Sequence, residues 1–191
     1  MARLSAPDFT EHMTITMGTG EKNMLETLRV ASLLVATLTM GLSAGLIYTF
    51  SMAVMTGLQR TDDRTFVTAM QQINVGILNG WFALSFGGAF VFTIVAAALQ
   101  LHRAGRPVLW WVLAALALYT VGVLLVTFGF SIPLNDELAA AGDPDTIQDF
   151  GAVRERFEDA WARLNIVRAV AGAAAFGCLA WALVLFGRAT S

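Results

Sequence analysis

The sequence predicts an all-α integral membrane protein that folds as an antiparallel four-helix bundle. Hydrophobic residues make up 57% of the 191 residues and charged residues only 14%, whereas an ordinary soluble domain carries about 25% charged residues. Four stretches contain no Asp, Glu, Lys or Arg, and a bilayer-spanning helix needs roughly 20 apolar residues. These stretches are residues 30–59, 65–102, 107–135 and 169–187. A soluble enzyme is therefore excluded.

The scarce cysteines and histidines narrow the chemistry. Cys178 is the only cysteine, so neither an intrachain disulfide nor a Cys-x-x-Cys redox pair can form. His12 and His102 are far apart, and neither belongs to a Glu-x-x-His pattern, which argues against a di-iron site and against a bis-histidine haem. The sequence also lacks the GxGxxG and Walker phosphate-binding patterns. We expect no metal, no cofactor and no nucleic-acid partner.

The N-terminal part is predicted to hold a flexible tail and the first span. Residues 1–27 are mixed and polar, which is typical of a flexible terminus. The first span covers about residues 30–54, and its uncharged run exceeds the roughly 7–15 apolar residues of a signal peptide, so we interpret it as a retained anchor. Gly41 and Gly45 form a GxxxG spacing that allows close helix packing. That packing would occur inside the bundle or, alternatively, in a dimer.

The second helix is predicted to be long. It covers about residues 63–102, of which only about 80–101 need to lie in lipid. Thr61 or Asp62 can cap its N-terminus. Its first part is amphipathic, and Asn79-Gly80 is expected to kink it where it enters the membrane.

The remaining chain is predicted to form two further spans joined by an acidic connection. The third span covers about residues 108–130, and residues 131–150 form the connection. The fourth helix covers about residues 152–187, with about 166–187 in lipid. The four-helix transmembrane domain is thus expected to occupy residues 28–188.

The charges of the loops predict the orientation. Lys and Arg are tied, with six on each side of the membrane, but the short loop 102–107 is purely basic while the opposite side carries ten acidic residues. Short basic loops stay in the cytoplasm. We expect a multi-pass protein of the cell membrane with both termini in the cytoplasm.

Polar residues gather on the acidic side and form the candidate site. On the fourth helix they fall on one stripe, because their spacing is helical. The neighbouring helices add further polar residues near the same level. The members are Tyr48, Thr68, Gln71, Asn74, Asn79, Asn135, Arg154, Glu158, Trp161, Asn165 and Arg168.

Arg168 is the most informative of these residues. The last uncharged run begins directly after it, so its charge lies near the apolar boundary and needs a partner or a wet cavity. Three interpretations remain open. The cluster ties the helices together, or it also lines a ligand pocket, or it forms a surface for a partner.

Four sequence runs resemble the anthrone oxygenase-like family of small four-helix membrane proteins. They are GLIYTFSMAVMTGL (45–58), DDRTFVTAMQQINVGILNGWF (62–82), PLNDEL (133–138) and WARLNIVRA (161–169). The resemblance extends over about residues 28–187, and Gly80 departs from the residue that follows the Asn in many members. The recurring polar residues of the family fall on Gln71, Asn74, Asn79, Asn135, Trp161, Asn165 and Arg168.

The resemblance implies a cofactor-independent oxygenase of lipophilic anthrone-like or phenolic substrates. Arg168, Asn74 and Asn165 would stabilise a developing oxyanion, and Glu158 or the Asp62-Asp63 pair would accept the proton. The expected substrate-binding residues are Gln71, Asn79, Asn135, Trp161 and Tyr48.

The same residues are also compatible with a function that is not catalytic. The alternative is a non-catalytic membrane protein that binds a lipid or a quinone-like molecule, or an assembly factor. The expected partners are the lipid bilayer and a lipophilic small molecule, and a homo-oligomer also remains open.

Overall fold

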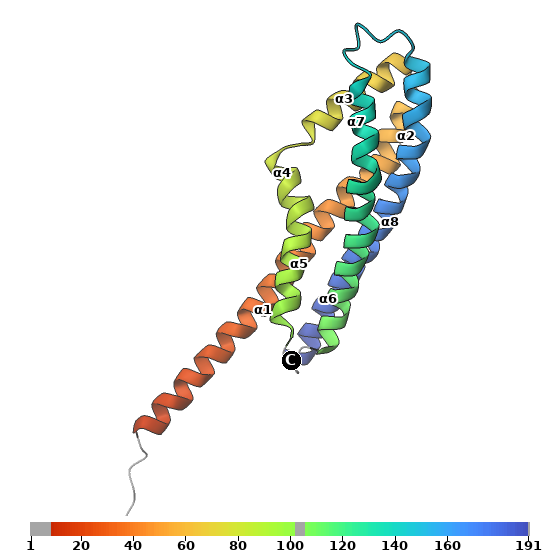
Figure 1. Cartoon of the computed structure of the whole chain (residues 1–191). Coiled ribbons are helices and arrows are strands. Elements are labelled where there is room, and N and C mark those ends of the chain that lie inside the picture. Colours follow the sequence, from red (N-terminus) through yellow and green to blue (C-terminus); the bar gives the residue numbers. More distant parts are fainter. Residues whose placement is uncertain (1–8, 102–105, 191) are drawn as a thin grey trace, which may run out of the picture.

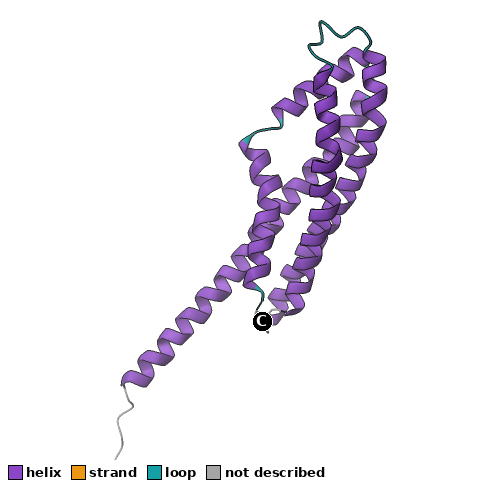
Figure 2. Ribbon diagram, viewed as in Figure 1, coloured by secondary structure: helices purple, strands orange, loops and turns teal. Residues whose placement is uncertain are grey.

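The computed structural model describes residues 9–101 and 106–190, which are almost entirely helical (Figures 1 and 2). The described residues contain no strand. Four helical stretches are long and apolar enough to cross a membrane: Gly20–Leu58, Gly80–Leu99, Arg106–Ala140 and Phe150–Ala189. The predicted all-α class is therefore confirmed, and so is the presence of four apolar helical stretches that could cross a membrane.

The first three stretches are each composed of several helical segments. The first holds α1 (Phe9–Thr49), the π-helical turn η1 (Phe50–Val54) and α2 (Met55–Leu58), and the second holds α4 (Gly80–Phe82), η2 (Ala83–Gly87) and α5 (Gly88–Leu99). The third holds α6 (Arg106–Tyr119), η4 (Thr120–Leu125), η5 (Thr127–Ser131) and α7 (Ile132–Ala140). The fourth is the single helix α8 (Phe150–Thr190), and α3 (Asp63–Gly76) lies between the first two stretches. π-Helical turns inside α-helices are frequent at functional sites.

Hydrogen bonds between distant residues show how the first helices pack. Nε of Arg29 donates to the carbonyl of Leu99 at 2.9 Å, so this part of α1 lies beside the end of α5. Further along α1, Ser43 Oγ lies 2.8 Å from the hydroxyl of Tyr119, which donates to the carbonyl of Phe86. Residue numbers therefore rise along α1 while they fall along the second stretch, so these two helical stretches run in opposite directions.

Small residues let α8 approach its neighbours closely. A Cβ on Gly122 would collide with the side chain of Ala171, and a Cβ on Gly172 would lie 3.4 Å from Ala44. Each of these glycines therefore faces another helix, as expected for tight membrane packing. Gly122 and Ala171 bring η4 and α8 together about one helical turn from Arg168.

The two glycines of the GxxxG spacing differ in their surroundings. A Cβ on Gly41 would lie 3.0 Å from the ring of Phe176 on α8, whereas nothing lies within 4 Å of the corresponding position on Gly45. Only Gly41 thus contributes to close packing inside the chain.

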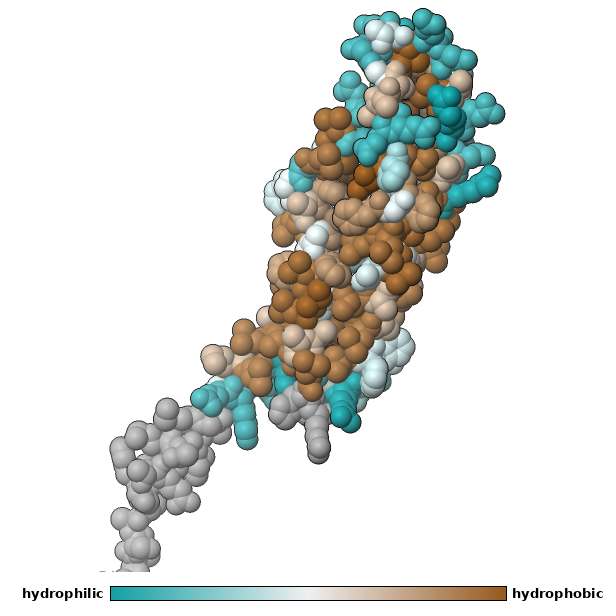
Figure 3. Space-filling view, in the orientation of Figure 1, coloured by the Kyte–Doolittle hydropathy of each residue, from teal (hydrophilic) through white to brown (hydrophobic). Residues whose placement is uncertain are grey.

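A second apolar core lies toward one end of the molecule, where α2, α3 and α7 pack on the first part of α8. It contains Met55, Phe66, Met70, Leu138 and Phe157, which are almost completely buried. The surface around the middle of the molecule is apolar, and hydrophilic side chains gather at this far end (Figure 3). The second core packs α3 and α7 onto the charged part of α8.

The long second helix expected over residues 63–102 is interrupted. The helix α3 ends at Gly76, residues 77–79 form a connection, and the apolar helix begins again at Gly80. The side chain of Asn79 accepts hydrogen bonds from the backbone N–H groups of Trp81 and Phe82 and so caps α4. The expected kink is therefore a complete break, because an amide that caps a new helix starts it in a new direction.

Part of the expected flexible N-terminal tail is helical. Helix α1 begins at Phe9 and continues without interruption into the first span. Residues 1–8 of the expected tail lie outside the described residues. At the other helix start, Asp62 is the N-cap of α3, which is one of the two capping residues expected.

Candidate functional site

A cavity of about 450 Å³ lies where α3 and its connection to α4 meet the η5–α7 junction and α8. Cavities of roughly 300–1,000 Å³ are typical small-molecule sites. The walls are largely apolar and include Phe50, Phe82, Phe86 and Phe128. The polar or charged lining side chains are Gln71, Asn74, Thr127, Ser131, Asn135, Asp136, Trp161, Asn165 and Arg168.

Three π-helical turns supply part of this lining. Phe50 comes from η1, Phe86 from η2, and Thr127 with Ser131 from η5. A π-turn shifts the helical phase and therefore redirects the side chains that follow it. The turns thus orient residues from three different helices toward one space.

The guanidinium of Arg168 forms the cationic end of the cavity. Its Nη2 donates to Asn165 Oδ1 at 2.6 Å and its Nη1 to Thr127 Oγ1 at 3.3 Å. It lies over the ring of Trp161, with Cζ 5.3 Å from the ring centroid. Arg168 is only 9% exposed, and within the described part of the chain it forms no ion pair.

Asn165 fixes the position of that guanidinium. Its Nδ2 donates to the carbonyl of Ile47 at 3.0 Å and to Ser51 Oγ at 2.7 Å, so α8 is tied to α1 and η1. The side chain is 1% exposed. Because both ends of the amide are engaged, Asn165 presents Oδ1 to Arg168 in a fixed orientation.

Two buried donors in the cavity wall have no partner. Nε of Arg168 and Nδ2 of Asn74 are buried and make no hydrogen bond, and both residues line the cavity. A buried donor without an acceptor costs about 1–3 kcal/mol. Such groups call for an explanation, for example a bound water, a bound ion or a functional role.

Trp161 and Gln71 hold the cavity walls in place. The indole Nε1 of Trp161 donates to Asn135 Oδ1 at 3.0 Å, which joins α8 to α7. Nε2 of Gln71 donates to the carbonyls of Leu138 and Gly142 at 3.0 and 3.1 Å, which joins α3 to the end of α7. Both side chains therefore hold together the helices that form the cavity walls.

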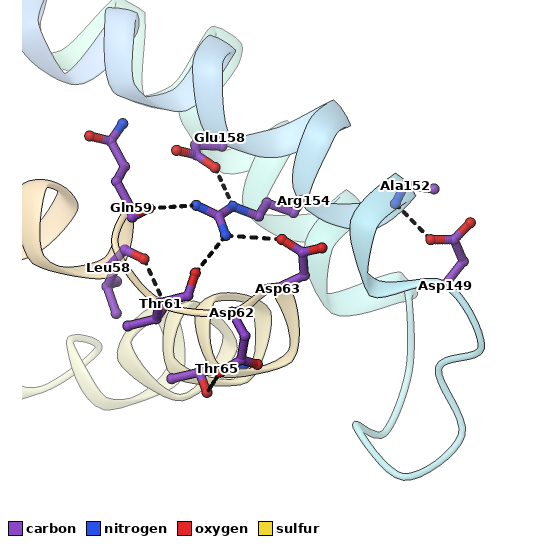
Figure 4. A network of polar contacts seen from close by, with 10 residues as sticks. All are labelled: Leu58, Gln59, Thr61, Asp62, Asp63, Thr65, Asp149, Ala152, Arg154 and Glu158. Atoms are coloured by element: carbon purple, nitrogen blue, oxygen red, sulfur yellow. Dashed lines mark hydrogen bonds and ion pairs between the residues drawn. The ribbon is translucent and has the colours of Figure 1, made fainter.

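The structure brings together six of the nine site residues expected from the sequence and places three elsewhere. Gln71, Asn74, Asn135, Trp161, Asn165 and Arg168 line the cavity. Tyr48 is 54% exposed on α1, and Asn79 is occupied as a helix cap. Glu158 pairs with Arg154 outside the cavity (Figure 4).

The Arg154 network explains why the acids expected as bases lie outside the cavity. Arg154 contacts Glu158, Asp63 Oδ1 at 3.0 Å, and the carbonyls of Thr61 and Gln59 (Figure 4). It also stacks over Phe66, with Cζ 4.6 Å from the ring centroid. The network closes the α2–α3 turn onto α8 and has a structural role.

The sequence reasoning missed several lining residues. The aromatic residues Phe50 and Phe86 and the hydroxyl residues Thr127 and Ser131 lie in uncharged runs that appear uniformly apolar, and Asp136 appears as one of several acids in a connection. The π-turns that direct four of these residues inward leave no recognisable pattern in a single sequence. For Asp136, the available signal was its neighbour Asn135, which the sequence already placed in the candidate site.

A metal site can be assessed only for the histidine, cysteine and acidic side chains that the structure describes. Among the side chains that the structure describes, no group of three or more His, Cys, Asp and Glu residues could hold a metal ion. The side chains of His12 and His102 lie outside that set.

The comparisons with known proteins identify the family. No match was found among curated proteins or among solved structures. A family model described as anthrone oxygenase matches residues 80–178, which is just over half of the chain and includes Asn135, Trp161, Asn165 and Arg168. The chain therefore belongs to the anthrone oxygenase family.

Proposed function

We propose that the cavity binds a lipophilic aromatic molecule with an acidic oxygen and that the protein oxygenates this molecule with O2, without a cofactor. The observation that carries the proposal is the pair of unpartnered buried donors, Arg168 Nε and Asn74 Nδ2, in the wall of one largely apolar cavity. An enolate or phenolate oxygen would satisfy both donors. It would also supply the counter-charge that Arg168 lacks within the described residues.

The chemistry requires that a negative charge be stabilised on oxygen. An anthrone carries a carbonyl and, opposite to it, a methylene group. Loss of a methylene proton gives an electron-rich enolate that can transfer an electron to O2 directly. In sum, the methylene group and O2 give a carbonyl group and water. Donors that are fixed before the reaction stabilise such a charge most effectively, and Asn165 holds Arg168 in that way.

The cavity rim favours entry from lipid. Val75 and Leu78 on one side and Phe128 and Ile132 on the other line the cavity and are also exposed. Trp81, next to the connection 77–79, is 83% exposed. An apolar rim of this kind would admit a molecule that is dissolved in the bilayer.

The test is turnover of anthrone by the purified protein in detergent. We expect consumption of one O2 for each anthraquinone formed, above the rate in detergent alone. Asn74→Leu should strongly reduce this rate. Gln72→Leu is the matched control, because Gln72 is an amide on the same helix, is exposed and does not line the cavity. Turnover equal to the detergent background would contradict the proposal.

A second candidate function is non-catalytic binding of a quinone-like molecule. The same two donors would hold a quinone carbonyl, and Arg168 and Asn165 also tie α8 to its neighbours. Retention of a quinone in native mass spectrometry without any O2 consumption on anthrone would favour this function.

A further inference from the structure

Removal of the methylene proton requires an acceptor, and the acids favoured by the sequence are already engaged. Glu158 and Asp63 both contact Arg154. Asp62 accepts hydrogen bonds from Thr65 and caps α3. These three acids do not line the cavity.

The cavity contains one other carboxylate. Of the residues that line it, only Asp136 and Arg168 carry ionisable side chains. We propose that Asp136 is the proton acceptor of the oxygenation reaction, an inference that rests on the proposed function. A carboxylate is an effective general base when it lies within reach of the proton that it removes.

The position of Asp136 suits this role because it lies away from the cationic end. Arg168 donates to Thr127, and the chain from Thr127 to Asp136 is helical throughout, passing from η5 into α7. Nine residues of helix correspond to roughly 13 Å. This separation leaves room for a ring system whose oxygen meets Arg168 while its opposite carbon faces Asp136.

Two neighbouring contacts distinguish Asp136 from the acid that follows it. Asn135 is bonded to Trp161 on α8, which fixes this turn of α7 against the cavity. Glu137 lies 3.8 Å from Arg156 in an exposed ion pair and lines a different, much smaller hollow. Asp136 is exposed at the cavity mouth, so water can take the proton away afterwards.

The step balances without any change of oxidation state. The C–H bond of the methylene group breaks and an O–H bond forms on the Asp136 carboxylate. The electron pair of the C–H bond passes through the ring to the carbonyl oxygen, where Arg168 and Asn74 stabilise the charge. Oxidation by O2 follows as a separate step.

The experiment isolates this step by excluding O2. Anthrone is incubated anaerobically in D2O with the purified protein, and incorporation of deuterium at its methylene carbon is measured. Anthrone binding is followed separately by quenching of tryptophan fluorescence. We expect wild-type protein to accelerate the exchange. Asp136→Asn should slow it about 100-fold or more with unchanged binding and melting temperature, and Asp136→Glu should restore part of the rate.

Glu137→Gln is the matched control and should exchange like wild type. Equal exchange in wild type and Asp136→Asn would overturn the assignment of Asp136, as would a loss of exchange that only accompanies a loss of anthrone binding. No acceleration by the wild type would overturn the assignment together with the proposed function. Exchange without later O2 consumption would contradict oxygenation alone and support the role of Asp136.

Discussion

Nη2 of Arg168 donates a 2.6 Å hydrogen bond to Oδ1 of Asn165, one turn earlier on the same helix. The other end of that amide is held by Ile47 and Ser51 of the first span. The orientation of the buried guanidinium is thus set by a helix more than a hundred residues away in the sequence. Positioning of Arg168 and association of α8 with α1 are consequently coupled.

Asn165→Leu should lower both stability and ligand binding. The substitution removes the donor for the Ile47 carbonyl and the acceptor for Arg168, and each buried polar group left without a partner costs about 1–3 kcal/mol. The measurement is the melting temperature in detergent together with anthrone binding. A variant with wild-type values for both would show that the hydrogen bonds of Asn165 are unimportant.

Arg154→Met should lower the melting temperature and leave anthrone binding unchanged. Arg154 joins Glu158 and Asp63 to two backbone carbonyls of the α2–α3 turn, and removal leaves the partly buried Glu158 carboxylate and Thr61 carbonyl unpaired at a cost of about 1–3 kcal/mol. Arg163→Met should have little effect, because its ion pair is exposed and exposed ion pairs contribute little. A loss of binding in Arg154→Met at full stability would instead connect this network to the site.

Gly122→Ala and Gly45→Ala form a matched pair. The new methyl group at residue 122 meets Ala171 on α8, whereas nothing lies near residue 45. Overpacking costs about 1–3 kcal/mol, while alanine in a helix interior is about 0.5–1 kcal/mol more stable than glycine. We expect opposite shifts of the melting temperature. Shifts of the same sign would contradict the close approach of η4 and α8.

The cap of α3 predicts a dependence of stability on pH. The hydroxyl and the backbone N–H of Thr65 donate to the Asp62 carboxylate and hold the pKa of Asp62 below its ordinary value. The folded state therefore has the lower pKa. The stability contributed by the ionised cap is complete at neutral pH and is lost as the pH falls through the folded pKa, below about pH 4.

The measurement compares the melting temperatures of wild type, Asp62→Ala and Asp62→Asn across pH 2–7. The difference between wild type and Asp62→Ala should be constant near neutral pH and shrink on acidification. Asp62→Asn is the control, because an amide caps without titrating. A difference between wild type and Asp62→Ala that grows as the pH falls would contradict the sign.

The four spans could be predicted because charge is excluded from lipid, so uncharged runs mark them directly. The stripe of Trp161, Asn165 and Arg168 was predictable because α8 is one regular helix, which keeps its phase over many turns. The same periodicity placed Glu158 on the stripe, but Arg154, which itself donates to the α2–α3 turn, binds that carboxylate outside the cavity. Only the tertiary contacts determine whether the Glu158 carboxylate faces the cavity.

The other differences between the predicted and the observed site arise where the chain departs from a regular α-helical period. The apolar pattern continues through Ile77 and Leu78, so nothing before Asn79 indicates that α3 has ended. Tyr48 lies in the last turn of α1 and faces outward, while Phe50 within the π-turn faces the cavity. A period of 3.6 residues does not describe such turns, and they supply much of the aromatic lining.

The most direct test of the account is Arg168→Met, measured for anthrone binding and for melting temperature in the same detergent. The account predicts that binding is lost while the melting temperature changes little, because the desolvation cost removed with the buried charge offsets the loss of its hydrogen bonds to Asn165 and Thr127. Arg168→Lys should restore binding only in part, since an ammonium lacks the planar fork of the guanidinium. A lowered melting temperature with wild-type anthrone binding would show that Arg168 only ties the helices, and would contradict the account.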